Sequence, residues 1–282
     1  MANPTPRASG AAGTYMTSRG VELCYELNGD GVPIAFVNSF FMPSAGWRLF
    51  TEDLVRTNRI LTYDLGAQGW SHEDVADFGS YVADLDELLD ALELESTYLL
   101  GHSSGTQIAA AYAAECPQRV RGLVLVGPLV NPTGGERRRA MVAAWRDAYV
   151  SGGWPRLFDL LWWLVHSEAT LERAGPMGRR LMRRRFEELN RESDPMPLFA
   201  LSDTHQVEFA PDWSAIAMPT LLLSGADDCV TTTSGLAETR ELIASSEVVL
   251  VPRAGHVLYL EAPQAFQSEV RRFVERVEAG RG

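Results

Sequence analysis

Short apolar runs alternate along the chain with longer amphipathic stretches. The runs are aliphatic, aromatic or β-branched and lie at residues 21–27, 33–37, 59–63, 97–100, 122–126, 220–223 and 248–251. The run at 21–27 alternates in the strand period and ends at the turn signal Asn28-Gly29, and the other six are typical of strands that are buried on both faces of a sheet. Between them, helical spacing of apolar residues appears at 81–92 and 263–277, and an Ala-rich stretch at 106–115 stops at Pro117. This alternation predicts an α/β fold, with a mostly parallel sheet and helices on both of its faces.

One long stretch, residues 131–213, interrupts the alternation. It shows no convincing strand pattern, and we interpret it as three or four helices inserted between the strands at 122–126 and 220–223. Five of the seven tryptophans lie in it. An insertion of this kind is expected to form a cap over a cleft, although a helical layer packed only for stability would show the same pattern. The arginines within 179–185 lie at helical spacings from glutamates, which favours a solvated, salt-bridged face over an anion site.

The rest of the chain divides into a short tail and a core. Residues 1–13 are rich in Pro, Gly, Ser and Ala and contain no apolar segment of a signal peptide, so we expect a disordered tail. Residues 14–130 and 214–282 are expected to form the core. A chain of 282 residues can bury enough surface to fold without a disulfide or a structural metal. No apolar run is long enough to suggest a membrane span.

Charge and cysteine content exclude several classes of function. All 25 basic residues are arginine, so the chain has no lysine to bind nucleotide phosphates or to form a Schiff base. The net charge of −12 and the pI of about 4.9 disfavour nucleic acid as a partner. The three cysteines form no C-x-x-C pair, which argues against zinc-finger and thioredoxin-like sites. An odd cysteine count without a secretory signal fits a reducing compartment, and we expect a cytoplasmic protein.

The sharpest chemical signal is the sequence GHSSG at residues 101–105. It follows the strand at 97–100 directly and opens the Ala-rich helix. G-x-S-x-G between a strand and a helix is the pattern of a nucleophile elbow, in which a strained turn lifts the Ser103 hydroxyl above the sheet. The flanking glycines avoid Cβ atoms where strand and helix come close. The backbone N–H of Ser104, at the helix N-terminus, is then placed to stabilise an oxyanion.

A serine hydroxyl is a weak nucleophile, so a base is expected close to it in space. Of the five histidines, His256 follows a strand end at the same edge of the sheet as the elbow, which makes it the candidate base. His102 lies inside the elbow and is expected to point away from the site. His72 lies in a polar loop, and His166 and His205 lie in the helical insertion.

The candidate acid lies after the strand at 220–223. This strand ends at Gly225, which is followed by two adjacent carboxylates, Asp227 and Asp228. Only one of them can point into the site and orient the imidazole. The chain order is serine, aspartate, histidine, as in an α/β-hydrolase.

These features resemble the α/β-hydrolase fold family, in its serine-nucleophile branch with a helical cap, and the resemblance covers about residues 20–130 and 213–278. It implies a sheet of the eight-stranded type and no cofactor or metal. The implied catalytic triad is Ser103, Asp228 and His256. In this family the acid usually lies three residues after the strand-end glycine, which selects Asp228 over its neighbour.

The resemblance also assigns an oxyanion hole. The family's first-strand motif is His-Gly, followed by a residue whose N–H completes the hole, and the matching residues here are Asn38, Ser39 and Phe40. By this match, the N–H groups of Phe40 and Ser104 are the two donors. Asn38 in place of histidine resembles the branch of the family that transfers hydroxyacyl chains from a carrier protein. The family's D-x-R-G-x-G-x-S loop appears at residues 64–71 without its arginine.

Three kinds of activity fit these residues. In the first, His256 removes the Ser103 proton, an ester or thioester forms an acyl-enzyme, and water releases the acid. In the second, an alcohol or thiol takes the acyl group, so the protein is an acyltransferase. The third is a non-hydrolytic cyclase, a lyase or a binding protein on the same scaffold. Ser103 excludes the mechanism of dehalogenases and epoxide hydrolases, which use Asp at the elbow.

The expected substrate is a small molecule with an apolar or aromatic acyl group, and an acyl group bound to a carrier protein is an alternative. The residues expected to bind it are Asn38, Phe41, Trp70, Trp162 and Trp163. Because Trp162 and Trp163 are adjacent on a predicted helix, only one of them is expected to face the cleft. A different interpretation is that the tryptophans of the insertion only fill the interior of the cap.

Overall fold

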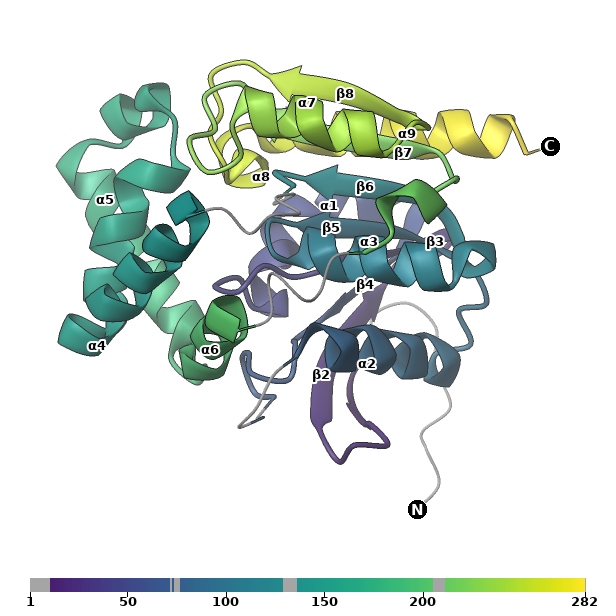
Figure 1. The fold of residues 1–282 in the computed structure, drawn as a ribbon, viewed down its shortest axis with the longest axis horizontal. Helices are drawn as coiled ribbons and strands as arrows, with labels where there is room; N and C mark the ends of the chain where they lie inside the picture. Colours follow the sequence, from purple (N-terminus) through teal and green to yellow (C-terminus); the bar gives the residue numbers. More distant parts are fainter. Residues whose placement is uncertain (1–10, 72, 74–76, 129–135, 205–210, 282) are drawn as a thin grey trace.

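The computed structural model describes residues 11–71, 73, 77–128, 136–204 and 211–281. Its centre is an eight-stranded sheet with the strand order β1-β2-β4-β3-β5-β6-β7-β8 (Figure 1). The strands are β1 (Ala11–Met16), β2 (Glu22–Asn28), β3 (Val32–Val37), β4 (Asn58–Tyr63), β5 (Thr97–His102), β6 (Val120–Val126), β7 (Thr220–Gly225) and β8 (Ser246–Val251). The pairs β1–β2 and β2–β4 are antiparallel and all the other pairs are parallel. The predicted fold class is confirmed.

The edge strand β1 corrects the expectation that a disordered tail reaches residue 13. Ala11 pairs with Leu27, and the ladder continues to the pair of Met16 with Glu22. The side chains of β1 alternate between half-buried and exposed. Because its sequence AAGTYM has few large apolar residues and a glycine inside it, β1 lacks the pattern that revealed the inner strands.

Helices cover both faces of the sheet (Figure 1). On the core these elements are η1 (Ser44–Phe50), α1 (Glu52–Val55), α2 (Phe78–Ala91), α3 (Gly105–Glu115), η2 (Pro117–Arg119), η3 (Trp213–Ala215), α7 (Thr233–Leu242), α8 (Leu258–Glu261) and α9 (Pro263–Ala279). One apolar cluster joins the sheet to α2, α3 and α7, and a second joins it to α1, α8 and α9. Neighbouring residues of β5 divide between them, with Leu99 in the first cluster and Leu100 in the second. This explains why the inner strands are continuous apolar runs.

The insertion between β6 and β7 is helical, as expected, and comprises α4 (Glu136–Val165), α5 (Glu168–Asn190) and α6 (Met196–Thr204) in the part that the structure describes. The backbone leaves helical geometry at residues 152–153 of α4 and at residue 175 of α5. The three helices lie together beside the core, on the side toward which β6 and β8 point (Figure 1). A third apolar cluster, built around Trp145, Leu161 and Phe199, joins these helices, and Leu198 and Leu201 of α6 belong to the first cluster of the core. We call this helical unit the cap.

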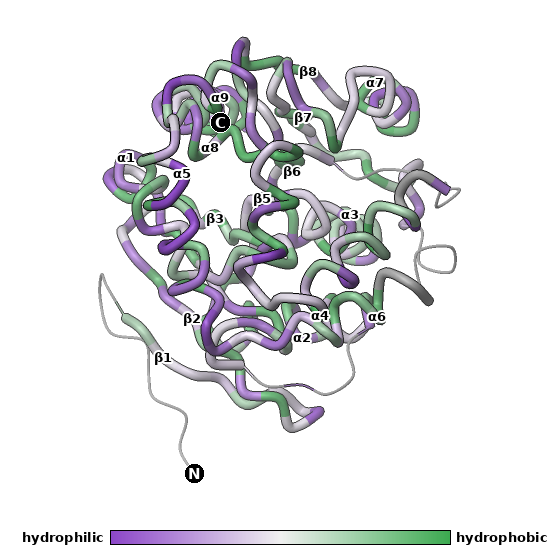
Figure 2. Tube along the Cα trace, turned by 90° about the vertical axis from the view of Figure 1, so that its left-hand side faces the viewer, coloured by the Kyte–Doolittle hydropathy of each residue, from purple (hydrophilic) through white to green (hydrophobic). Residues whose placement is uncertain are grey.

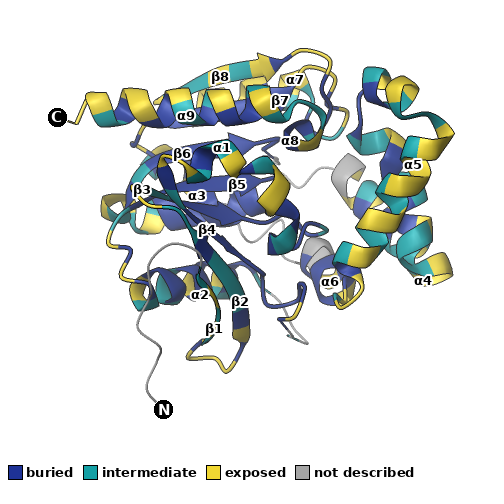
Figure 3. Ribbon diagram, turned by 180° about the vertical axis from the view of Figure 1, so that it is seen from behind, coloured by how far each residue is buried: buried dark blue, intermediate teal, exposed yellow. Residues whose placement is uncertain are grey.

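The arginine-rich face of α5 is salt-bridged. Arg183 binds Glu187 at 2.8 Å, and both Arg179 and Arg183 reach Asp159 of α4, at 2.8 and 3.5 Å. Helix α5 is largely hydrophilic along its length (Figure 2) and much of its surface is exposed (Figure 3). These contacts agree with the interpretation as a solvated face, and they add an ion pair between two cap helices.

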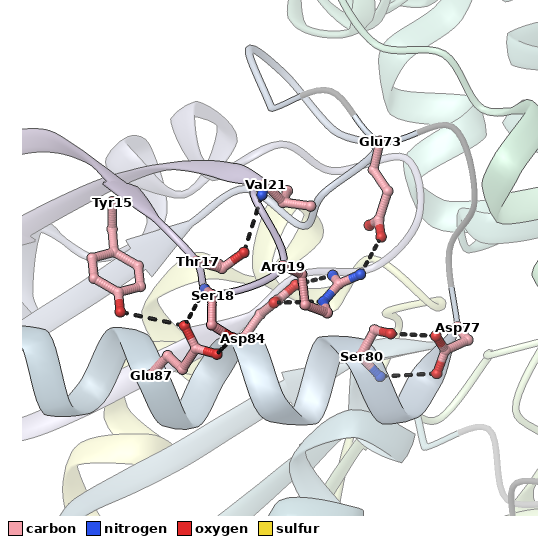
Figure 4. Close-up of polar contacts among 10 residues, drawn as sticks. All are labelled: Tyr15, Thr17, Ser18, Arg19, Val21, Glu73, Asp77, Ser80, Asp84 and Glu87. Atoms are coloured by element: carbon pink, nitrogen blue, oxygen red, sulfur yellow. Dashed lines mark hydrogen bonds and ion pairs between the residues drawn. The ribbon is translucent and has the colours of Figure 1, made fainter.

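The hairpin turn between β1 and β2 is tied to α2 by charged groups (Figure 4). The Arg19 guanidinium lies 2.7 Å from Asp84 and 2.7 Å from Glu73, and Glu87 accepts a hydrogen bond from the Ser18 N–H at 2.7 Å. Burial raises the pKa of Asp84 and of Glu73, although Arg19 opposes this effect. The ion pairs therefore compensate part of the cost of placing two carboxylates under the hairpin. Among the described residues, no helix combines the length and apolarity needed to cross a membrane.

Candidate active site

The turn between β5 and α3 holds Ser103 in a strained backbone conformation, with a φ of 53°. Its N–H donates to the carbonyl of Val126 at 2.9 Å, which ties the turn to the end of β6. A Cβ on Gly101 would lie 2.6 Å from the Gly105 carbonyl oxygen, and a Cβ on Gly105 would lie 2.4 Å from the Val37 carbonyl oxygen. Both glycines are therefore required by the close approach of helix and strands, as the elbow motif predicts.

His256 and Asp228 extend from this serine in a continuous hydrogen-bonded chain. His256 Nε2 lies 2.9 Å from Ser103 Oγ, and His256 Nδ1 lies 2.8 Å from Asp228 Oδ2. His256 comes from the loop between β8 and α8, and Asp228 from the loop after β7. The structure thus brings together three side chains that are far apart in the sequence and places them at the carboxyl ends of parallel strands.

The surroundings of Asp228 favour its charged form. Its Oδ1 accepts hydrogen bonds from the N–H groups of Val230 and Thr231, both at 2.8 Å, and its Oδ2 lies 3.3 Å from Ser224 Oγ. Burial alone would raise the pKa of Asp228, but the His256 ring and these hydrogen bonds outweigh it and leave the pKa below its usual value. A carboxylate that faces Nδ1 keeps the proton of the neutral imidazole on that nitrogen and leaves Nε2 as an acceptor toward the serine.

Two backbone N–H groups at the elbow, those of Ser104 and Phe40, are the candidate donors of an oxyanion hole. In the described part of the chain, the Ser104 N–H has no hydrogen-bond acceptor. The Phe40 N–H donates to Ser104 Oγ at 3.1 Å. An oxyanion at this place would accept from the Ser104 N–H directly and would share or replace the hydroxyl as the acceptor of the Phe40 N–H.

Ser103 lies in the wall of a cavity of about 240 Å³ between the core and the cap. Its wall is predominantly apolar, with Phe40, Phe41 and Met42 from the core and Trp145, Phe158 and Trp162 from the cap among the lining residues. Phe41 also packs edge-on against Trp145 at a ring distance of 5.7 Å. A cavity of this composition suits an apolar group placed beside the serine hydroxyl. Among the described residues, no group of three or more His, Cys, Asp or Glu side chains could hold a metal ion.

Three residues that the sequence analysis assigned to substrate binding do not line this cavity. Asn38 is fully buried and uses its amide internally: it donates to the Tyr63 carbonyl at 2.6 Å and accepts from Trp47 Nε1 at 2.7 Å. Trp70 is 63% exposed and Trp163 is 58% exposed, and both rings lie outside the cavity. The adjacent Trp162 is buried and lines it. The role of Asn38 is therefore to connect the end of β3 with β4 and η1.

The other histidines have different surroundings. His102 lies under the site, where its Nε2 is 3.2 Å from the His256 carbonyl oxygen. Burial above all, and then the nearby His256, lower the pKa of His102 to about 3, so this ring stays neutral. His166 lines the cavity, with Nδ1 2.9 Å from the Trp162 carbonyl oxygen. His72 and His205 lie outside the described residues.

Sequence reasoning missed the residues that join the cap to the His256 loop. They are Val165 and Ser167 at the junction of α4 and α5, and Glu261 in α8. Their hydrogen bonds connect segments that are about ninety residues apart, and no local sequence pattern predicts such contacts. The one available signal is Gly255, directly before the histidine, since a glycine beside a functional residue often marks a close approach of another backbone.

A mostly parallel eight-stranded sheet with this site at the carboxyl ends of its strands defines an α/β-hydrolase. The chain belongs to the alpha/beta hydrolase fold family, whose model matches residues 32–263.

Two of its relatives are named for reactions of small molecules. It is 29% identical to N-formylmaleamate deformylase of Pseudomonas putida, over 88% of this chain and 90% of that protein. It is 27% identical to 2-hydroxy-6-oxo-2,4-heptadienoate hydrolase of Pseudomonas putida, over 93% of this chain and 96% of that protein. A hydrolase of Pseudomonas aeruginosa has a similar solved structure, with a TM-score of 0.78, 27% identity, and coverage of 93% of this chain and 98% of that one.

Proposed function

We propose that this protein is a serine hydrolase that forms an acyl-enzyme on Ser103 from a small ester or thioester with an apolar or aromatic acyl group, and then hydrolyses it. The observation that carries the proposal is the unbroken chain from Ser103 Oγ through His256 to Asp228, at 2.9 and 2.8 Å, beside an apolar cavity. A nucleophile, a base and an orienting carboxylate in hydrogen-bonding contact are the requirements of covalent acyl transfer.

The reaction follows from this geometry. As Ser103 Oγ attacks the carbonyl carbon, its proton passes to His256 Nε2, and the imidazolium is stabilised by Asp228. The oxygen that becomes negative is stabilised by the N–H groups of Ser104 and Phe40. Collapse of the intermediate breaks the bond to the alcohol or thiol, which leaves with the proton from His256. Water then repeats the sequence on the acyl-enzyme and releases the acid and free Ser103.

The cavity supports the proposed acyl group. Apolar side chains from the core and the cap surround the space next to Ser103, so an aliphatic or aromatic acyl chain would be removed from water there. The named substrates of the two curated relatives are small molecules, which supports a small-molecule substrate here as well. Transfer of the acyl group to an alcohol or thiol would use the same residues with a different acceptor in the second step.

The test is an activity screen with p-nitrophenyl esters and acyl-CoA thioesters of increasing chain length, with intact-mass detection of the acyl-enzyme. We expect hydrolysis and a mass increase equal to the acyl group on Ser103. Ser103→Ala should reduce turnover by about 10⁴–10⁶ because the triad acts as a unit. The exposed Ser268 of α9 provides the matched control, since Ser268→Ala should leave turnover unchanged. Near-normal turnover of Ser103→Ala would refute covalent catalysis by this serine.

A further inference from the structure

The cap contacts the His256 loop at a short joint, residues 165–167, where α4 ends and α5 begins. The Val165 carbonyl oxygen accepts from the His256 N–H at 2.9 Å and from the Val257 N–H at 3.3 Å. The Ser167 hydroxyl lies 3.1 Å from the Arg253 carbonyl oxygen of the same loop. The backbone of the candidate base is therefore bonded to the cap as well as to the core.

Glu261 connects the two sides of this contact. Its Oε1 accepts from the Gly255 N–H at 2.8 Å, and its Oε2 accepts from the Ser167 N–H at 3.0 Å and lies 2.5 Å from Ser167 Oγ. Ser167 is almost fully buried. Hydrogen bonds to a carboxylate are shorter and stronger than those between neutral groups. One carboxylate thus holds Gly255, the residue before the base, and Ser167, the N-cap residue of α5.

The contact at Gly255 is close-packed. A Cβ on this residue would lie 2.7 Å from the Val165 carbonyl oxygen, 2.8 Å from the Ser167 nitrogen and 2.9 Å from Glu261 Oε1. The backbone of the joint therefore packs directly against the backbone of the His256 loop at Gly255, with no side chain between them. A displacement of the joint moves the loop, because neither side has room to take it up.

The same joint forms part of the cavity wall. His166, between the two tethered residues, lines the cavity, and its ring lies 4.5 Å from that of Trp162. Val165 lines the cavity as well. The same segment of the cap therefore lines the cavity and is hydrogen-bonded to the loop that carries His256.

We propose that Glu261 is a positioning residue: it locks the joint 165–167 to the His256 loop, so that the imidazole is aligned with Ser103 only while the cap is docked. This inference rests on the proposed function. The base has to stay within hydrogen-bonding distance of Ser103 Oγ, and a misplacement of about 1 Å can reduce the rate by about 100-fold. Substrate binding against His166 and the alignment of the base are then coupled through three consecutive residues.

The test compares the wild-type protein with Glu261→Ala and Glu261→Gln, and with Glu269→Ala as a matched control, since Glu269 pairs only with the exposed Arg272 among the described residues. An alkyl fluorophosphonate probe serves for active-site titration and for measuring the labelling rate of Ser103. Turnover per titrated site and KM are measured with p-nitrophenyl butyrate. We expect Glu261→Ala to lower kcat and the labelling rate by about 10- to 100-fold, because the base is misplaced.

The fall in kcat should exceed the change in KM, because the base acts in the chemical step, whereas Val165 and His166 are only two of the many residues that line the cavity. Glu261→Gln should lie between the wild type and Glu261→Ala, because an amide retains one acceptor oxygen for one of the two sides. Glu269→Ala should match the wild type. If Glu261 only stabilises the fold, Glu261→Ala should reduce the fraction of protein that the probe titrates and leave the rate per titrated site unchanged. That result would overturn the inference.

The two proposals fail in different ways. If the probe does not label Ser103 in the wild-type protein, the proposed function is wrong. If it labels the wild type and Glu261→Ala equally fast, the proposed function stands and the positioning role is refuted. Should Glu261→Ala not fold, Ser167→Ala removes the hydroxyl from the joint and leaves the Glu261 bond to Gly255 in place. It should lower kcat by about three- to tenfold, and a wild-type kcat of this variant would refute the role of the joint.

Discussion

Replacing Asp228 with asparagine tests the choice between the two adjacent carboxylates. Asp228 Oδ1 holds the N–H groups of Val230 and Thr231, and Oδ2 faces His256 Nδ1. Asparagine has one acceptor oxygen, which the two backbone donors will take. Its NH₂ group then faces His256, so the imidazole has to accept at Nδ1 and carry its proton on Nε2. In that tautomer the ring cannot remove the proton from Ser103.

The expected loss in turnover is about 10⁴, which corresponds to about 5 kcal/mol in the activation barrier. Asp227→Asn is the matched control. Asp227 is exposed, so the loss of its charge should change turnover by no more than about twofold. The two variants remove the same charge from neighbouring positions, and the difference between them isolates the orientation of the imidazole.

The assay is steady-state hydrolysis of the best ester from the screen, with far-UV circular dichroism and thermal melting to verify that both variants are folded. The reasoning is refuted if Asp227→Asn is the more damaging substitution. It is also refuted if Asp228→Asn retains more than about a tenth of the wild-type turnover, because the wrong tautomer cannot support that rate.

Three further substitutions test the cavity, the buried histidine and the elbow. Trp162→Ala should change the ratio of kcat/KM between short and long acyl esters by about 10- to 200-fold, whereas the exposed Trp163→Ala should leave it unchanged; equal ratios in both variants would exclude Trp162 from the acyl pocket. Because burial above all lowers the pKa of His102 to about 3, the unfolded chain binds more protons below about pH 6.5, and stability in urea titrations should fall by about 2 kcal/mol from pH 7 to pH 5. His102→Gln should reduce this fall, and an unchanged slope would contradict the assignment; burial also lowers the pKa of His166, which therefore retains a part of the pH dependence. Gly105→Ala forces a Cβ to 2.4 Å from a backbone oxygen and should cost about 1–3 kcal/mol or more, while Gly280→Ala, with its nearest neighbour at 3.6 Å, should melt like the wild type.

The sequence predicted the inner strands well because strands such as β5 and β7 are buried on both faces, and continuous apolar runs record that burial directly. The elbow at Ser103 could be predicted because its pattern is local: Gly101 is required by a contact within the strand–turn–helix unit, and Gly105 by the approach of this unit to the end of β3. His256 and the pair Asp227 and Asp228 could then be selected from their places after strands, because parallel strands present their carboxyl ends at one edge. The choice of Asp228 within the pair came from the resemblance to the α/β-hydrolase family.

The errors have a common physical origin in contacts between distant segments. Asn38 was assigned to substrate binding, yet its amide is used by Tyr63 and Trp47, and nothing near Asn38 in the sequence indicates these partners. Aromatic type alone could not separate the exposed Trp70 from the cavity-lining Trp162. Strand β1 is an edge strand with modest burial, so its composition carries little signal.

The separate apolar cluster of the cap bears on how enzymes of this kind can diverge. Since the cluster around Trp145, Leu161 and Phe199 is distinct from the two clusters that hold the sheet, a new substrate preference can arise by changing its residues with little effect on the scaffold. Leu198 and Leu201 of α6 are an exception, because they belong to the first sheet cluster. The joint at residues 165–167 is a second exception, because its backbone is bonded to the loop that carries His256. Natural variation should therefore be broad in the walls of the cap and narrow at the joint, and a cap exchanged between relatives by protein engineering should be cut outside this segment.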